Sequence, residues 1–281
     1  MASKAAILVR SLECHPSTQS ASISTQLAGM GRSLELTTST EKVFRTLNDL
    51  GHSVQSTSRI LDFGCGNGDT VQALRDQNWE VYGCDLKFKE GPNVLALSRD
   101  HIIRLIPDEE YRLPFKDDYF DCVYSAEVFE HVRNYPETLS EIHRVLKPGG
   151  VSLHLFPSRY RLMESHVCIP FASLVQRYWW LWLWAAIGVR KESQKTLSAK
   201  ETALINLNYL KTSTNYYSKN TITSFVTKIF HEFQFCEITA ARHSDKLHRV
   251  YPLLKTLPFA GQLLSTFQTR ALFLKKQGSR A

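Results

Sequence analysis

Short apolar runs alternate with amphipathic segments between residues 41 and 157. Runs of four to six apolar residues are typical of buried strands, whereas apolar positions three and four residues apart are typical of helices. The pattern predicts helices at 41–50, 70–77, 93–98 and 136–146, and strands at 59–62, 80–84, 101–106, 120–125 and 151–156. Strands that alternate with helices in this way form a parallel sheet that is wound on both faces.

The pattern weakens beyond residue 157, where a helix is predicted at 220–233 and strands at 235–240 and 271–275. Helices broken at Pro252 and Pro258 are expected between these two strands. We therefore expect an α/β fold with a doubly wound, mostly parallel, seven-stranded sheet. Its expected parts are a flexible tail at 1–40, a core at 41–160, a helical insertion after the fifth strand at 161–217, and a part at 218–281 that completes the sheet.

A glycine-rich turn follows the first predicted strand, in the stretch RILDFGCGNG from Arg59 to Gly68. Glycines at alternate positions allow unusual backbone dihedral angles and the close approach of a ligand. Their spacing differs from the dinucleotide pattern G-x-G-x-x-G, because Asp69 stands where the third glycine would be. Asp62 precedes the glycines, and its carboxylate suits an ammonium group. The turn therefore predicts a nucleotide-like cofactor other than a dinucleotide.

Asp85 ends the second predicted strand, about 20 residues after the glycines, where an acidic side chain accepts hydrogen bonds from ribose hydroxyls. A helix cap or a turn residue is the alternative interpretation of this aspartate. The ribose role is favoured, because the residue follows a strand at the expected spacing.

Three further motifs follow in order: LPFKDDYFDCV at 113–123, EHV at 130–132 and LKPGG at 146–150. Together with the glycine turn and Asp85, they resemble the class I S-adenosylmethionine-dependent methyltransferases, and most closely the type 11 methyltransferase domain. The resemblance covers Arg59 to Pro157. It implies a Rossmann-like sheet, S-adenosyl-L-methionine as the cofactor, and in-line transfer of its methyl group.

The resemblance also implies which residues contact the cofactor. Asp62 and the glycine backbone would face the methionine portion, Asp85 the ribose and Leu86 the adenine. In the acidic run at 108–110, Glu109 matches the usual distance for the adenine amino group, with a solvated acidic turn as the alternative. The full set of expected cofactor contacts is Asp62, Gly64, Cys65, Gly66, Gly68, Asp85, Leu86, Glu109 and Glu127.

The candidate catalytic residues are His131, His166 and Glu130. A helix after the fourth strand would put Glu127, Glu130 and His131 on one face. His131 is a candidate general base because the pKa of free histidine lies near neutrality. The alternative is that Glu130 and His131 only shape the cofactor pocket. His166 is a second candidate base, because it is expected where the roof of the acceptor pocket should form. The alternative is a surface or capping histidine.

The composition narrows the possible partners. The six cysteines include no CxxC pair, so no metal site is expected, and reduced thiols in or beside strands favour a cytoplasmic protein. The formal net charge of +7 indicates a solvated basic surface or an anionic partner. No nucleic-acid-binding motif is present in the sequence, so no nucleic acid partner is expected.

The run YWWLWLWAAI from Tyr178 to Ile187 is strongly apolar. As a helix it would extend about 15 Å, too short for a bilayer core of about 30 Å. Peripheral membrane contact, a buried cap helix, a dimer contact and a wall for an apolar acceptor all remain open, as does the oligomeric state.

The expected function is therefore methyl transfer to a small-molecule or lipid-like acceptor. One alternative is a non-catalytic interaction protein that binds the cofactor. Another is an NAD(P)-dependent oxidoreductase, against which Asp69 and the segment 113–121 both argue.

Overall fold

The computed structural model describes residues 38–107, 111–244, 251–257, 259–267 and 269–278. They fall into two compact units. The sheet unit contains the described residues up to Pro157 and from Tyr217 onward, and the helical unit contains Ser158–Tyr216. Residues 1–37 of the predicted tail lie outside the described residues, and residues 38–40 begin the first described helix.

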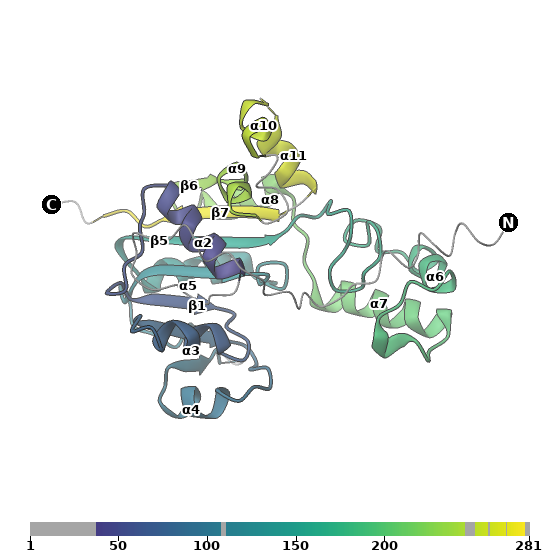
Figure 1. The fold of residues 1–281 in the computed structure, drawn as a ribbon, viewed down its shortest axis with the longest axis horizontal. Helices are drawn as coiled ribbons and strands as arrows, with labels where there is room; N and C mark the ends of the chain where they lie inside the picture. Colours follow the sequence, from purple (N-terminus) through teal and green to yellow (C-terminus); the bar gives the residue numbers. More distant parts are fainter. Residues whose placement is uncertain (1–37, 108–110, 245–250, 258, 268, 279–281) are drawn as a thin grey trace. The chain divides into compact units, whose positions relative to one another are not determined.

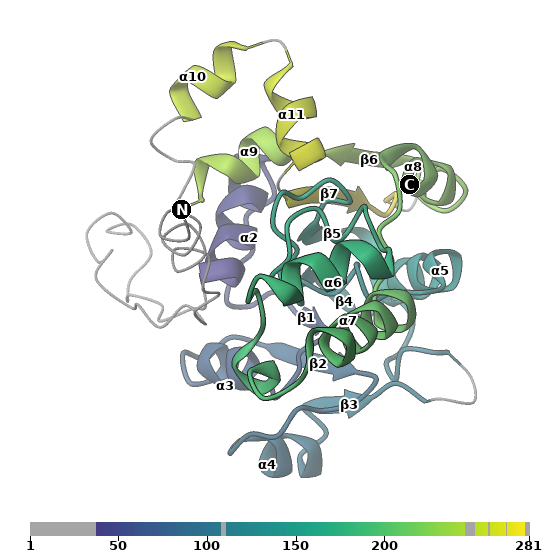
Figure 2. The same cartoon turned by 90° about the vertical axis from the view of Figure 1, so that its right-hand side faces the viewer.

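The sheet unit contains all seven strands of the described chain, and they form one sheet in the order β3-β2-β1-β4-β5-β7-β6 (Figures 1 and 2). Strands β1 to β5 pair in parallel, and β7 is antiparallel to both β5 and β6. The predicted mostly parallel, doubly wound sheet is confirmed. The elements of this unit are α2 (Thr38–Asp49), β1 (Ile60–Phe63), α3 (Asp69–Arg75), β2 (Val81–Asp85), α4 (Val94–Arg99), β3 (Ile103–Leu105), β4 (Phe120–Ala126), α5 (Tyr135–Val145), β5 (Leu146–Pro157), α8 (Lys219–Val226), β6 (Glu232–Phe235), α9 (Glu237–Arg242), α10 (Tyr251–Thr256), α11 (Ala260–Phe267) and β7 (Thr269–Lys275).

Strand β1 lies at the centre of the sheet, and its four residues are all buried. Ile60 packs with side chains from α2 and α3 on one face, while Leu61 and Phe63 pack with α5 and α8 on the other. This division follows from the alternation of side chains along a strand. Because both faces of β1 are covered, the only free direction for a ligand is along the strand axis, beyond its carboxyl end.

The segment that precedes β4 is held against α5 by Arg144. The guanidinium group donates to the carbonyls of Leu113 and Phe115, both at 2.8 Å. It also pairs with Asp117 at 2.7 Å and with Glu141 at 2.6 Å. Glu141 in turn accepts the Leu113 N–H at 2.7 Å. Charge-assisted bonds of this kind are stronger than neutral ones, so the segment is fixed without regular secondary structure of its own.

Two predicted elements in the C-terminal part are wrong in their bounds. The sixth strand is Glu232–Phe235 and not 235–240, because the ladder with β7 ends where the Cys236 N–H donates to Ala271 O at 2.8 Å. Residues 237–242 form α9 instead. The helix predicted at 220–233 is shorter and ends at Val226. The predicted break at Pro258 lies outside the described residues.

The helical unit contains α6 (Tyr178–Ala186), a short 3-10 helix at Glu192–Gln194 and α7 (Ala199–Ser213). Helices α6 and α7 lie beside each other (Figure 2). They pack around a small apolar core to which Val167, Ile169, Leu181 and Leu210 belong. In the part of the chain that the structure describes, no helix combines the length and apolar character that crossing a membrane requires.

Candidate functional site

The glycine turn after β1 requires glycine at several positions. Gly64, Gly66 and Gly68 have φ values of +83°, +60° and +75°, in the left-handed region that side chains disfavour. A Cβ on Gly64 would also lie only 2.4 Å from Cγ2 of Val128. The turn therefore packs directly against the segment that follows β4.

Asp85, at the end of β2, is bonded to this turn. Its Oδ2 accepts the Gly66 N–H at 2.8 Å, and its Oδ1 accepts the Lys87 N–H at 3.3 Å. The N–H groups of Gly64 and Cys65 both donate to Cys84 O, at 2.7 and 3.1 Å. The turn and the end of β2 are thus one bonded assembly, with the half-buried Asp85 carboxylate at its edge. Leu86 follows directly, with 55% of its surface exposed.

Asp62 is a buried carboxyl group near the carboxyl end of β1, opposite Tyr124 of β4 and 7% exposed. Its pKa is raised to about 7: burial raises it most, the Tyr124 hydroxyl lowers it, and the neighbouring Asp85 carboxylate makes a smaller contribution that raises it. The Tyr124 hydroxyl lies close to Asp62 without meeting the full geometry of a hydrogen bond. A buried carboxyl group that titrates near neutrality suits a cationic ligand, because a positive charge beside it favours the ionised form.

The segment after β4 does not form the helix that would align Glu127, Glu130 and His131, and this expectation is wrong. Glu127 has φ +56° and is exposed, and its N–H donates to Leu155 O at 2.8 Å. A single turn follows, closed by the His131 N–H on Val128 O at 2.8 Å. Glu130 and His131 remain neighbours, with 3.9 Å between a Glu130 carboxylate oxygen and His131 Nε2. The three residues therefore do not share one face of a helix.

His166 belongs to the helical unit, where it is held by a buried glutamate. Its Nδ1 lies 2.8 Å from Oε1 of Glu164, and its backbone N–H donates to Oε2 of the same residue at 2.8 Å. The Tyr216 hydroxyl also donates to Glu164, at 2.6 Å. Hydrogen bonds from His166 and Tyr216 hold the pKa of Glu164 below its ordinary value, although burial acts in the opposite direction. His166 is accordingly part of an internal bonded network.

The structure gathers most of the expected cofactor residues at one end of the sheet: Asp62, the glycine turn, Asp85 and Leu86. Cys65 belongs to the turn, and its thiol is buried, with a pKa raised chiefly by burial, so it packs as a small apolar group. Glu109 lies outside the described residues. Sequence reasoning missed Val128 and Tyr124, although the register of β4 on β1 would have placed Tyr124 beside Asp62.

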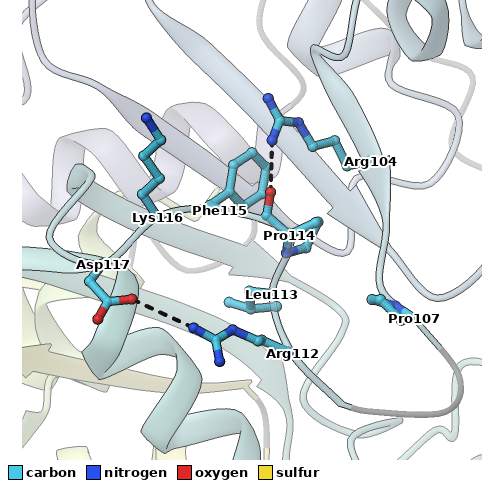
Figure 3. Close-up of a pocket in the computed structure, with 8 residues that line it drawn as sticks. All are labelled: Arg104, Pro107, Arg112, Leu113, Pro114, Phe115, Lys116 and Asp117. Carbon is cyan, nitrogen blue, oxygen red and sulfur yellow. Dashed lines mark hydrogen bonds and ion pairs between the residues drawn. The ribbon is translucent and has the colours of Figure 1, made fainter.

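A cavity of about 690 Å³ lies beside the edge strand β3 (Figure 3). It is lined by Arg104, Pro107 and residues 112–117. The Arg104 guanidinium donates to Pro114 O at 2.8 Å and stacks over the Phe115 ring, and Arg112 pairs with Asp117 at 4.0 Å. None of the lining residues belongs to the glycine turn or to β1 and β2. This cavity is therefore distinct from the candidate cofactor site.

Comparison with known families decides the class of protein. Residues 61–153, which carry the glycine turn, Asp85 and the segment after β4, match the family model described as methyltransferase domain. Residues 61–153 therefore form a methyltransferase domain of the kind found in class I S-adenosylmethionine-dependent methyltransferases. S-adenosylmethionine is the cofactor of that family, which agrees with the prediction from the sequence.

Curated relatives of the chain include two demethylmenaquinone methyltransferases. The protein from Geobacillus stearothermophilus is 34% identical over 113 residues, which are 38% of this chain and 48% of the relative. The protein from Staphylococcus aureus (strain JH9) is 31% identical over 158 residues, 49% of this chain and 63% of the relative. The chain thus spans about half of the length of these relatives.

Solved structures resemble the chain more distantly. One is an S-adenosylmethionine-dependent methyltransferase from Mesorhizobium loti, with 16% identity, a TM-score of 0.45, and coverage of 79% of this chain and 94% of that one. Another is the phosphoethanolamine N-methyltransferase 2 of Haemonchus contortus in complex with S-adenosyl-L-methionine, with 17% identity, a TM-score of 0.44, and coverage of 83% and 52%. Neither likeness bears on the acceptor of this chain.

The contact between Gly64 and Val128 gives a test of the turn. We expect Gly64→Ala to lower the free energy of unfolding by about 2–5 kcal/mol, since a left-handed alanine costs about 1–2 kcal/mol and overpacking adds about 1–3 kcal/mol. Gly149→Ala is the matched control, because Gly149 has φ +81° with no atom of the described residues within 4 Å of its Cβ position. The free energy of unfolding of Gly149→Ala should fall only by the conformational cost of a left-handed alanine.

Chemical denaturation of both variants measures the difference. Adding Val128→Ala to Gly64→Ala should recover part of the loss, because it removes the two γ carbons that lie within 3 Å of the new Cβ. Equal losses in Gly64→Ala and Gly149→Ala would contradict the close contact.

Proposed function

We propose that this methyltransferase transfers the methyl group of S-adenosylmethionine to a small-molecule or lipid-like acceptor. The observation that carries the proposal is the buried Asp62 carboxyl group beside Asp85, at the carboxyl ends of β1 and β2 and next to the left-handed glycine turn. The two carboxyl groups and the open turn match the chemistry of a ligand with a cationic amino acid end and a ribose. They do not match a pyrophosphate, which two carboxylates would repel.

The residues take distinct roles in this proposal. The Asp62 carboxylate holds the ammonium group of the cofactor, and the backbone at Gly64, Cys65, Gly66 and Gly68 faces its methionine portion. Asp85 accepts hydrogen bonds from the ribose hydroxyls, since only part of its capacity is used by the N–H groups of Gly66 and Lys87. The exposed Leu86 side chain flanks the adenine. Glu109 is proposed to contact the adenine amino group, and Glu127 is proposed to form part of the wall of the cofactor pocket.

S-adenosylmethionine supplies an electrophilic methyl group when it is bound. The chain has to align the acceptor with that group, and alignment alone contributes much of the rate in such a displacement. An acceptor that loses a proton as it attacks also needs a base. We propose His131 for this role, with the proton taken at a ring nitrogen and the Glu130 carboxylate, 3.9 Å from Nε2, stabilising the charged ring. His166 is proposed as a second acceptor-side residue.

The nature of the acceptor rests on the relatives. The matched curated proteins are demethylmenaquinone methyltransferases, and this name supports a small-molecule acceptor for the chain. A protein that binds the cofactor without turnover is the second candidate, which the intact Asp62, glycine turn and Asp85 do not distinguish from an enzyme. The acceptor experiment below separates the two.

Asp85→Asn tests the ribose assignment. We expect the dissociation constant for S-adenosylhomocysteine to rise roughly tenfold to hundredfold, because a hydrogen bond to a charged group contributes about 1.5–3 kcal/mol. Asparagine keeps one oxygen for the Gly66 N–H, so the turn should stay folded and the melting temperature should change little. Asp69→Asn is the control, since Asp69 is exposed and bonds to Asn67 and Asn93. Isothermal titration calorimetry measures both, and an unchanged affinity in Asp85→Asn rejects the assignment.

Asp62 predicts a pH dependence of cofactor binding. Its carboxyl group has a pKa of about 7 in the ligand-free protein and must ionise to hold an ammonium group. The affinity for S-adenosylhomocysteine should therefore rise as the pH increases towards 7 and then level off, with release of close to one proton at about pH 6. Calorimetry in buffers of different ionisation enthalpy counts this proton. Asp62→Asn should abolish the release and Asp69→Asn should keep it; release that persists in Asp62→Asn would assign the proton to another group.

The acceptor and the base are tested with cofactor labelled in its methyl group. Incubation with separated small-molecule, lipid and protein fractions should label the small-molecule or lipid fraction. His131→Ala and His166→Ala should each lower the turnover while leaving the affinity for S-adenosylhomocysteine within about twofold, since neither is assigned to cofactor binding. Full turnover in both variants would remove histidine base catalysis. Binding without labelling of any fraction would favour the non-catalytic protein.

A further inference from the structure

We infer that one face of α6 docks the helical unit onto the surface of an anionic lipid bilayer. Helix α6 has the sequence YWWLWLWAA and contains no charged residue. Its apolar side chains are spread around the whole helix rather than gathered in one stripe. A helix of this kind needs an apolar environment on every side. The helical unit covers only one side of it.

The covered side faces the core of the helical unit. Leu181 and Ala185 are fully buried there, and Trp180 and Trp184 pack against the same core. The Trp180 Nε1–H donates to Pro170 O at 2.8 Å. This side therefore explains two of the four tryptophans by packing within the unit.

The opposite side, which we call the outer face, consists of Tyr178, Trp179, Trp182, Leu183 and Ile187. Their exposed fractions are 38%, 60%, 44%, 43% and 50%. Each of them lies three or four residues from at least one other, so together they occupy one side of the helix. Because Trp179 and Trp182 remain 60% and 44% exposed and do not belong to the core of the helical unit, the outer face is not a buried cap core.

The charge of the unit indicates what covers the outer face. Between Ser158 and Tyr216 there are eight lysines and arginines but only three acids, so most of the chain's formal net charge of +7 lies in this unit. Five of the basic residues are exposed: Arg159, Arg177, Lys195, Lys200 and Lys211. The acids are engaged locally: Glu164 is buried in the network with His166, Glu192 pairs with Lys195 at 2.6 Å, and Glu201 caps α7 through Ser198.

Apolar aromatic surface combined with excess positive charge matches an anionic bilayer surface. Tryptophan and tyrosine favour the boundary between lipid and water, and each basic residue near an anionic surface adds attraction. The nine residues of α6 extend about 14 Å, so the helix lies in the interface and does not cross a core of about 30 Å. A second copy of this basic unit would bring like charges together, which disfavours self-association through the same face.

The tryptophans give a direct measurement, because four of the five in the chain lie in α6. We expect the fluorescence of the cofactor-free full chain to shift to shorter wavelength on vesicles of equal parts phosphatidylcholine and phosphatidylglycerol, and lipids brominated on their acyl chains should quench it. Phosphatidylcholine vesicles alone should bind more weakly, and added salt should weaken binding to the mixed vesicles.

Trp179→Gln combined with Trp182→Gln should lower the partition coefficient by roughly tenfold or more, because two large apolar surfaces are lost. Leu95→Gln is the matched control, since Leu95 is 85% exposed on α4 of the sheet unit and should leave binding unchanged. Circular dichroism should show that both variants fold. Loss of vesicle binding in the double variant alone supports the proposal.

Three results would overturn it: no binding of the unmodified chain to the mixed vesicles, equal binding by the double variant, or a dimer in solution that the double variant dissociates. The last result would assign the outer face to a second copy of the chain. None of these measurements uses methyl transfer, so they stand or fall separately from the proposed activity.

Discussion

The parallel pairing of β1 with β2 on one side and β4 on the other is the constraint on which the rest of the sheet unit depends. It brings Asp62 opposite Gly83 and Tyr124, and it makes three strands end at the same edge. The polar backbone of the glycine turn is then satisfied by β2 itself, through Cys84 O and the Asp85 carboxylate. A ligand that enters from this edge meets backbone and carboxyl groups whose positions are already fixed. Pre-organisation of this kind reduces the entropy lost on binding.

The two aspartates share one edge but differ in environment. Asp62 is removed from water and holds its proton up to about pH 7, whereas Asp85 is half-buried and bonded to two backbone N–H groups. Two neighbouring ionised carboxylates repel each other. A bound cation offsets this repulsion and also the cost of ionising Asp62 in its buried position. The electrostatic strain in the ligand-free site therefore favours a ligand that carries a positive charge at one end and hydroxyl groups at the other.

Much of this arrangement could be predicted from the sequence, because strand periodicity and glycine spacing are local signals. The glycine turn, Asp85 and the succession of the first five strands along the chain can each be predicted from runs of fewer than a dozen residues. The turn after β4 could not be predicted, because it depends on a positive φ at Glu127, which few residues other than glycine adopt. The role of Val128 could not be predicted for a different reason, because its contact with Gly64 joins segments that are far apart in the chain. The predicted bounds of the sixth strand are wrong because a short mixed run around Phe235 fits a strand and a helix equally well.

Helix α6 shows the same division between local and non-local information. Its apolar run predicts a helix that is stable in an apolar environment. Because the run is uniform, it does not indicate which side of the helix is buried. Only packing against Leu210 and the other core residues of the helical unit divides it into a covered side and the outer face. Exposed indoles at Trp179 and Trp182 add apolar surface that packing within the helical unit does not require, whereas polar side chains there would favour solubility. The exposed indoles are therefore best explained by an external apolar surface. The proposed docking also fits the lipid-like alternative of the proposed acceptor, because a protein on the bilayer surface would reach such an acceptor without its transfer through water, which its apolar surface opposes.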